Sequence, residues 1–133
     1  MNIALLAHQN KKELMVQFCI AYCGILSAHK LCATHGVGRL VQDTTGLPVT
    51  QYLSADQGGV QQIAARIAYN EIDLVLFFCD TAAPRYESDL AQICRLCDQY
   101  TVPFASNVAT AEVLIHGLQR GDMDWRDIVN PKK

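Results

Sequence analysis

The sequence has no long run of charged residues of either sign. Lysine and arginine together number 11, aspartate and glutamate number 13, and the formal net charge is −2. Proteins that bind nucleic acids or membrane surfaces through electrostatics carry clusters of basic residues. We therefore expect no nucleic-acid partner and no membrane partner, whereas a small charged ligand requires only a local group of cations.

The sequence also offers no membrane span and no secretion signal. Its first seven residues are mostly apolar, but no basic residue precedes them, and Lys11 and Lys12 follow soon after. A signal peptide has a basic segment before its apolar one, and a membrane-spanning helix needs about 20 apolar residues. These features predict a cytoplasmic protein.

Motifs for metals, disulfides and cofactors are scarce. Cys94 and Cys97 form one Cys-x-x-Cys pair, with no second pair and no histidine nearby at ligand spacing, whereas a structural zinc site needs four ligands. The six cysteines fall in or beside apolar strand and helix patterns, as buried reduced thiols do. The pair stays open as a redox or metal site, but we expect no metal and no cofactor.

The two common phosphate-binding fingerprints are incomplete as well. Gly36-x-Gly38 lacks the later glycine of a dinucleotide motif, and the chain has no Walker lysine pattern. Any phosphate site in this protein must therefore be built in another way.

Short apolar segments alternate with segments that have helical periodicity. The predicted strands are residues 2–7, 31–33, 49–53, 72–78 and 102–105. The predicted helices are residues 11–30, 38–43, 87–99 and 107–116, one that runs from the Gly58-Gly59 turn to about residue 70, and a short turn at 124–128. This alternation predicts a three-layer α/β sandwich with a five-stranded, mainly parallel, doubly wound sheet, formed by one domain over residues 1–133.

Polar or glycine-rich residues follow every predicted strand, at the edge of such a sheet where ligands bind. These residues are His8-Gln9, Thr34 to Gly38, Ser54 to Gly59, Cys79-Asp80 and Ser106-Asn107. Backbone N–H groups in the two glycine turns could bind an anion, although the glycines could equally serve only to form tight turns. Lys12 can reach back over the first strand to a phosphate, or it can be a solvated helix residue.

The histidines and aspartates near these strand ends have several possible roles. His8 suits acid or base work near neutral pH or a purely structural loop role, and His35 can contact a ligand directly. His29 and His116 lie at helix ends, where we expect them to cap carbonyl groups. The carboxylates that flank the loop after the central strand, Asp80 and Asp89, suit acid–base work or helix capping; in the capping role they compete with Glu87 and Ser88.

Five groups of residues, each weak alone, occur together in a familiar order. They are IALLAH at 3–8 with Lys12, Ala33-Thr34 with Gly38, LS at 53–54 with GGxQQ at 58–62, FFxD at 77–80, and VPxAxNxATA at 102–111. Together these motifs resemble methylglyoxal synthase, and the resemblance extends from residue 3 to about residue 116.

The resemblance implies a doubly wound sheet of five parallel strands with a small antiparallel addition, in a homo-oligomer that is usually a hexamer. Methylglyoxal synthases remove a C3 proton from dihydroxyacetone phosphate and eliminate phosphate, so an active member is a carbon–oxygen lyase acting on phosphates. The fold also occurs in carbamoyl-phosphate synthetase and IMP cyclohydrolase, where the same region accepts nucleotides or similar ligands. The fold alone therefore does not fix the activity.

Five positions match site residues of the family. His8 matches an active-site histidine, Lys12 a phosphate-binding lysine, and Thr34 and Ser54 ligand-binding positions. Asp89 matches an active-site aspartate if a one-residue deletion is placed in the loop before it.

Three features of the family pattern are changed. The family's Thr-Gly-Thr-Thr-Gly phosphate turn reads Thr-His-Gly-Val-Gly at residues 34–38. Val60 stands where the family has its proposed proton-abstracting aspartate, and Pro84 is followed by Arg85 and Tyr86 instead of the family's loop histidine. Loss of a general base typically removes a factor of about 10² to 10⁴ in rate.

These changes favour a protein that binds a small phosphorylated metabolite or nucleotide without catalysis, as a sensor or sequestering protein. The ligand-binding residues of this hypothesis are Lys12, Thr34, His35, Gly36, Gly38, Ser54, Gly59, Arg85, Tyr86 and Asn107. The alternative is a methylglyoxal synthase with a relocated base, for which the candidate catalytic residues are His8 with Asp56, Asp89 or Glu87. A structural or interaction subunit is a third possibility.

Overall fold

The computed structural model describes residues 1–131 and contains a five-stranded sheet with the strand order β3-β2-β1-β4-β5. The strands are β1 (Asn2–Ala7), β2 (Lys30–Ala33), β3 (Val49–Gln51), β4 (Leu74–Phe78) and β5 (Phe104–Ala105). Every neighbouring pair is parallel, which confirms the predicted fold class. Within residues 1–131 the sheet has no antiparallel addition of the kind that the resemblance implied.

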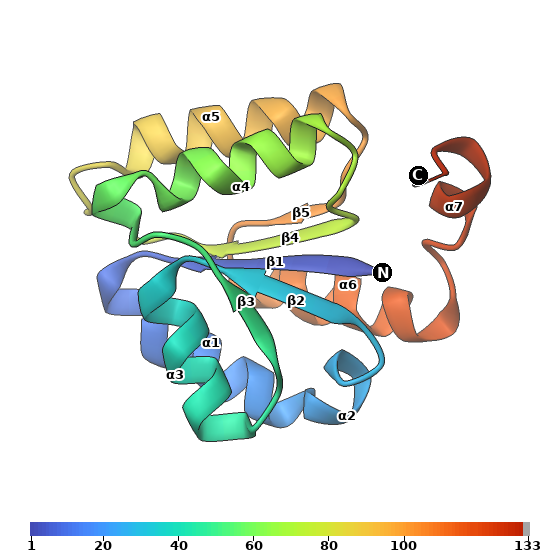
Figure 1. Cartoon of the computed structure of the whole chain (residues 1–133), viewed down its shortest axis with the longest axis horizontal. Helices are drawn as coiled ribbons and strands as arrows, with labels where there is room; N and C mark the ends of the chain where they lie inside the picture. Colours follow the sequence, from blue (N-terminus) through green and yellow to red (C-terminus); the bar gives the residue numbers. More distant parts are fainter. Residues whose placement is uncertain (132–133) are drawn as a thin grey trace.

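Helices cover both faces of this sheet. They are η1 (Gln9–Lys11), α1 (Lys12–Ala21), α2 (Cys23–Leu26), α3 (His35–Thr45), η2 (Ala55–Gln57), α4 (Gly59–Ala68), α5 (Tyr86–Gln99), α6 (Val108–Arg120) and α7 (Trp125–Val129). Figure 1 shows α4 and α5 on one face and α1, α3 and α6 on the other. None of the helices in the described part of the chain has the length and apolar character that crossing a membrane requires.

The two central strands separate two hydrophobic cores. Ile3 and Leu5 of β1 pack into the core beneath α1, α3 and α6, whereas Ala4 and Leu6 pack into the core beneath α4 and α5. All five residues of β4 are buried. A strand that is covered on both faces needs an unbroken apolar sequence, and the run Leu-Val-Leu-Phe-Phe of β4 meets this requirement.

Helix α3 begins earlier than the predicted range 38–43. His35 is its first residue, and the N–H of Gly38 donates to the carbonyl of Thr34 at 2.8 Å. The glycines at 36 and 38 therefore lie within the first turn of a helix and not in a loop. A Cβ on Gly38 would lie 2.8 Å from Cγ of Gln51, so this glycine lets α3 pack closely against the sheet.

The helix predicted over residues 11–30 is divided at Tyr22. Its backbone leaves helical geometry there, with φ −112° and ψ 24°, and its ring packs against Phe18 and His116. The remaining predicted helices and strands are found, with ends that differ by a few residues. Boundaries are the least certain part of such predictions because helix ends depend on local capping and tertiary contacts.

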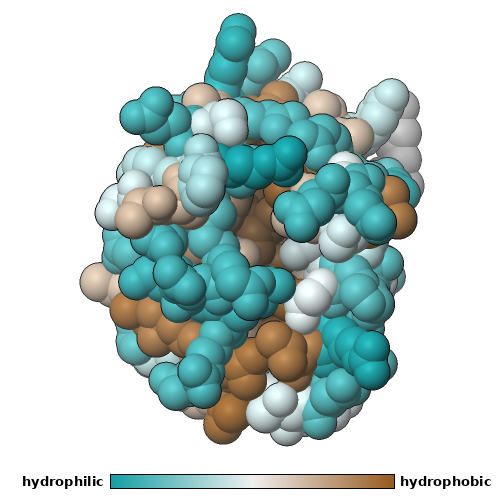
Figure 2. All heavy atoms as spheres, turned by 90° about the vertical axis from the view of Figure 1, so that its left-hand side faces the viewer, coloured by the Kyte–Doolittle hydropathy of each residue, from teal (hydrophilic) through white to brown (hydrophobic). Residues whose placement is uncertain are grey.

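The carboxyl ends and the amino ends of the strands lie on opposite sides of the molecule. The carboxyl ends of the strands lie at the left of Figure 1 and form the face that Figure 2 turns toward the viewer. The amino ends lie on the opposite side, near the N-terminus and α7. The first end carries the predicted site residues.

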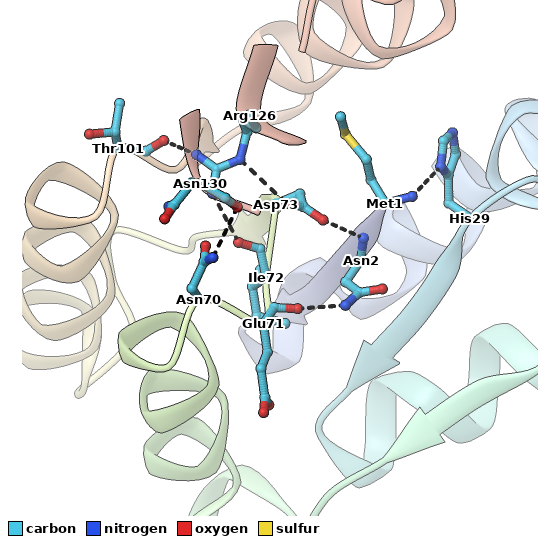
Figure 3. Close-up of polar contacts among 10 residues, drawn as sticks. All are labelled: Met1, Asn2, His29, Asn70, Glu71, Ile72, Asp73, Thr101, Arg126 and Asn130. Carbon is cyan, nitrogen blue, oxygen red and sulfur yellow. Dashed lines mark hydrogen bonds and ion pairs between the residues drawn. The ribbon is translucent and has the colours of Figure 1, made fainter. Parts of the chain in front are cut away.

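At the amino ends, a buried arginine holds α7 in place (Figure 3). Arg126 is 1% exposed, and its Nε lies 3.4 Å from Oδ1 of Asp73, which is fully buried. The guanidinium also donates to the carbonyls of Thr101 and Ile72. Asp73 in turn accepts the backbone N–H of Asn2 at 2.8 Å, so one ion pair joins α7 to the starts of β1 and β4.

All six cysteines are free thiols. Burial raises the pKa of Cys19, Cys32 and Cys97 to about 12 each. Within residues 1–131, no three His, Cys, Asp or Glu side chains gather in a way that could hold a metal ion.

Candidate active site

The predicted site residues gather at the carboxyl ends of the strands. Figure 2 shows this face hollowed near its centre, with apolar surface in the depth and hydrophilic residues around it. Parallel strands end at the same edge of the sheet, so the loops that follow β1, β2, β3 and β4 converge there. The topology brings together residues that are far apart in the sequence.

His8 lies at the end of β1, with a side chain that is 9% exposed. Its Nδ1 accepts the backbone N–H of Asp80 at 2.9 Å, and its Nε2 lies 3.4 Å from Oδ2 of Asp89. Because Nδ1 acts as an acceptor, the neutral imidazole carries its proton on Nε2 and directs it toward Asp89. The ring packs against Phe77 and meets Tyr86 edge-on, with centroid distances of 5.0 and 6.4 Å.

Asp89 is the buried carboxylate of the site, with 8% of its surface exposed. It lies in the first turn of α5, where the helix dipole favours negative charge. Burial, and then the nearby charge of Asp89, raises the pKa of the Cys79 thiol to about 11. Asp56 and Glu87, the other candidates for a relocated base, are exposed. Of the three, only Asp89 contacts the histidine.

Lys12 and the first turn of α3 form a positively charged surface that we call the anion cradle. A Cβ on Gly36 would lie 2.7 Å from Nζ of Lys12, so the ammonium lies directly over this turn. The turn contains no acidic residue, and Thr34 makes no side-chain capping hydrogen bond. Within residues 1–131, the N–H groups of Gly36 and Val37 have no acceptor. A helix N-terminus beside an ammonium group favours an anion at this position.

The turn that leads into α4 has strict backbone requirements. Gly58 has φ 102°, a left-handed conformation that glycine adopts without strain, and a Cβ on Gly59 would lie only 2.0 Å from the carbonyl oxygen of Leu53. Both glycines are therefore required by the fold itself. Val60 follows them with 2% exposure and packs in the core beneath α4 with Ile63. Its side chain offers no proton acceptor.

Other predicted ligand residues make contacts within the protein. Nη1 of Arg85 donates to the carbonyl of Ala55 at 3.3 Å, which ties the loop before α5 to η2. Asn107 caps α6, because its Oδ1 accepts the N–H of Thr110 at 3.0 Å. His35 is exposed at the start of α3. Ligand-binding roles for these residues stay predictions.

Ser54 and the two remaining histidines complete the placement of the predicted residues. The carbonyl of Ser54 accepts the N–H of Gly59 at 2.9 Å, so its backbone shapes the turn. Nδ1 of His29 lies 3.0 Å from the amino group of Met1, and burial, with the charge of that amino group, lowers its pKa. The ring of His116 meets Tyr22 edge-on. We expected His29 and His116 to cap carbonyl groups at helix ends. Neither of the contacts described here is such a cap.

The contact between His8 and the Asp80 N–H had no sign in the sequence. The two residues are 72 positions apart, and a backbone donor leaves no residue-type signature. Strand register supplies the explanation, because Ala7 pairs with Phe78 and places the residues after both strands side by side.

Comparison with known proteins identifies the family. A family model described as the MGS-like domain matches residues 15–106. The chain belongs to the MGS-like family. In this MGS-like chain, the matched region extends from α1 to the end of β5 and includes the anion cradle apart from Lys12.

Curated relatives of this MGS-like chain are named methylglyoxal synthase. The protein of Caldicellulosiruptor saccharolyticus is 58% identical over 134 residues, which cover 99% of this chain and 94% of the relative. The protein of Geobacillus thermodenitrificans is 52% identical over 132 residues, covering 98% and 91%. The crystal structure of methylglyoxal synthase from Elizabethkingia anophelis NUHP1 is 37% identical, with a TM-score of 0.80 and coverage of 86% and 76%.

These relatives bear on the two hypotheses drawn from the sequence. Identity of up to 58% with proteins named methylglyoxal synthase supports a methylglyoxal-synthase-like function for this MGS-like chain. It gives no support to the non-catalytic sensor or sequestering role. The alternative, an enzyme with a relocated base, agrees better with these findings.

Proposed function

We propose that this protein converts dihydroxyacetone phosphate to methylglyoxal and phosphate, with Asp89 as the base in place of the aspartate that Val60 replaces. One observation carries the proposal: the buried carboxylate of Asp89 contacts the Nε2 of His8 at 3.4 Å. The anion cradle is built at the same strand ends and supplies a place for the phosphate.

The phosphate group would lie in the anion cradle. Lys12 supplies an ammonium group, and the N–H groups of Gly36 and Val37 supply two directed donors. A bound dianion neutralises both the ammonium and the helix N-terminus, which the described part of the chain leaves without an acidic partner. Binding of the phosphate group also fixes the position of the carbon skeleton.

Proton transfer would then fall to Asp89 and His8. The Asp89 carboxylate takes the C3 proton, and the electron pair of the broken C–H bond forms the enediolate. The Nε2–H of neutral His8 donates to the developing oxyanion and so lowers the energy of this intermediate. The C3 hydroxyl then loses its proton as the C3 aldehyde forms, and the electron pair of the C2–C3 double bond shifts to C1–C2. The C1–O bond breaks with its electron pair on the leaving phosphate, which takes up the hydroxyl proton. The proton on Asp89 is then delivered to C1, which becomes the methyl group of methylglyoxal.

The direct test is incubation of the purified protein with dihydroxyacetone phosphate, followed by colorimetric detection of methylglyoxal and of released phosphate. We expect both products in equal amounts. Absence of both, in a protein that is folded and binds orthophosphate, would overturn the proposed reaction.

Binding without turnover is a second candidate, and the burial of Val60 favours it. The Val60→Asp variant separates the two, with Val60→Asn as a control that buries a polar group without a base. If only Val60→Asp gains activity over an inactive parent, the chain is a binding protein that has lost its base. If the parent is active and Val60→Asp adds little, Asp89 is sufficient.

The remaining assignments are also proposals. We infer a small phosphorylated metabolite as the ligand in preference to a nucleotide, because the relatives are named for methylglyoxal production. Assembly as a homo-oligomer, a hexamer by resemblance, and a cytoplasmic location complete the proposal. Light scattering coupled to gel filtration measures the number of subunits in the oligomer directly.

A further inference from the structure

A second concave site lies at the other ends of the strands. A pocket of about 190 Å³ opens beside the starts of β1 and β2, on the face of the sheet that α4 covers. Its polar wall contains Asn2, Lys30, Thr50, Arg66 and Glu71. None of the residues proposed for catalysis or phosphate binding contributes to it.

The charges around this amino-end pocket are unequal. Nη1 of Arg66 pairs with Oε2 of Glu71 at 2.6 Å, which satisfies the only carboxylate of the lining. Lys30 brings a second cation that has no acidic partner within the described residues. The lining therefore has a net positive charge, and the guanidinium of Arg66 keeps donors beyond the one that binds Glu71.

The wall is held in a fixed shape by neighbouring contacts. The guanidinium of Arg66 lies over the ring of Tyr52, 5.8 Å from its centre. The side-chain amide of Asn2 donates to the carbonyl of Glu71 at 2.7 Å, while the Glu71 side chain extends away from Asp73 and Arg126 (Figure 3). Stacking and ion pairing thus orient Arg66 in the absence of any ligand.

The remaining lining is apolar. Cys32 and Ile72 are buried in the core beneath α4 and form an apolar floor, and Tyr52 packs against the same core. An apolar floor with a few oriented polar groups is the usual composition of a small-molecule site. The volume of about 190 Å³ restricts the occupant to a small ligand.

We propose that this amino-end pocket binds a small organic monoanion, an aromatic carboxylate, whose ring lies on the apolar floor and whose carboxylate pairs with Arg66 and Lys30. Such a ligand meets the unpaired positive charge and the apolar surface together. Inorganic phosphate satisfies only the first. A neutral aromatic compound satisfies only the second.

Benzoate is the probe, titrated into the ¹⁵N-labelled full-length protein and followed by amide chemical shifts. We expect saturable shifts at Thr50, Tyr52 and Ile72 with a dissociation constant in the millimolar range, because a ligand with so few atoms has limited affinity. Benzyl alcohol, which has the same ring without the charge, is expected to leave these amides unchanged at the same concentration.

The Arg66→Gln variant tests the role of the guanidinium. Loss of a charge-assisted hydrogen bond is expected to raise the benzoate dissociation constant by about tenfold. Arg39→Gln is the matched control, because it removes the same charge from an exposed residue of α3 and should leave benzoate binding unchanged. Absence of saturable shifts in the parent protein, or an unchanged constant in Arg66→Gln, would refute the proposal. Orthophosphate shifts at Gly36 and Val37 report on the anion cradle separately.

Discussion

The imidazole of His8 is held between a backbone N–H donor at Nδ1, from Asp80, and the carboxylate of Asp89 at Nε2, at 2.9 and 3.4 Å. The first contact fixes the tautomer, and the second holds Nε2 beside a buried carboxylate. Histidine in this state donates a hydrogen bond and leaves proton abstraction to its partner. The division of roles in the proposed reaction follows from this arrangement.

Replacing Asp89 by asparagine tests that division. The amide keeps the size of the side chain but cannot accept a C3 proton, so we expect the rate of methylglyoxal formation to fall by about 10² to 10⁴. Asp98→Asn is the matched control, because it lies on the exposed side of the same helix. Steady-state kinetics with dihydroxyacetone phosphate measure both variants. An active Asp89→Asn enzyme would assign the base to another residue.

Gly36→Ala tests the anion cradle. The added methyl group would lie 2.7 Å from Nζ of Lys12, and the flexible lysine would move away from the first turn of α3 at little cost in stability. We expect orthophosphate binding, measured by isothermal titration calorimetry, to weaken by about tenfold. Gly24→Ala is the control, because a Cβ at that helical position meets no atom within 4 Å and should leave phosphate affinity unchanged.

Arg126→Met tests the buried ion pair that anchors α7. The substitution removes the Arg126 guanidinium from a buried ion pair with Asp73, and breaking such a pair costs about 3 to 5 kcal/mol of unfolding free energy. Arg120→Met removes an arginine that pairs with Asp122 on the surface, and we expect a cost of at most about 1 kcal/mol. Urea unfolding measures both. Equal losses of unfolding free energy in the two variants would show that the buried ion pair stabilises the protein no more than the surface pair does.

The buried cysteines are expected to resist alkylation. With a pKa of about 12, Cys19, Cys32 and Cys97 are almost entirely protonated at pH 8, and only the thiolate reacts. Iodoacetamide should therefore modify the partly exposed Cys94 well before these three in the native protein, and all of them in urea. Peptide mass spectrometry reads out each site. Early labelling of Cys97 in the native state would contradict its buried environment.

Because of the raised pKa values of the same thiols, we expect the protein to lose stability in alkaline solution. Their pKa values rise from 9.0 in the reference state to about 12 on folding, so the unfolded chain releases these protons first. The stabilisation is complete below pH 9 and decreases as the pH rises from about 9 toward 12. The urea midpoint should be lower at pH 10.5 than at pH 8. A Cys32→Ala variant should show a smaller decrease between the two pH values.

The fold was predictable because its signals are local. The apolar run at 74–78 requires burial on both faces, and the polar ends of successive strands must converge when the strands are parallel. The start of α3 was placed too late because glycines usually break helices. In this case Gly36 and Gly38 allow close packing against Lys12 and the sheet, which no local rule reveals.

The site itself was only partly predictable. Residue types pointed to His8, Lys12 and Asp89, but the choice among three possible bases depended on burial and distance. The exposed Asp56 and the buried Asp89 look equivalent in the sequence, and only the paths of η2 and α5 distinguish them. The anchoring of Arg126 had no sequence signal, because its partners are backbone carbonyls and a distant aspartate.

The Arg126 anchor also has a practical consequence for handling the protein. It fixes α7 at the side of the sheet where β1 begins, so both α7 and Met1 lie across the molecule from the carboxyl ends of the strands, where the candidate site lies (Figure 1). A fluorophore or a surface linker attached to α7 would leave that site facing the solution. The same attachment would lie near the amino-end pocket, so immobilised protein suits turnover assays, and benzoate binding is better measured on untethered protein.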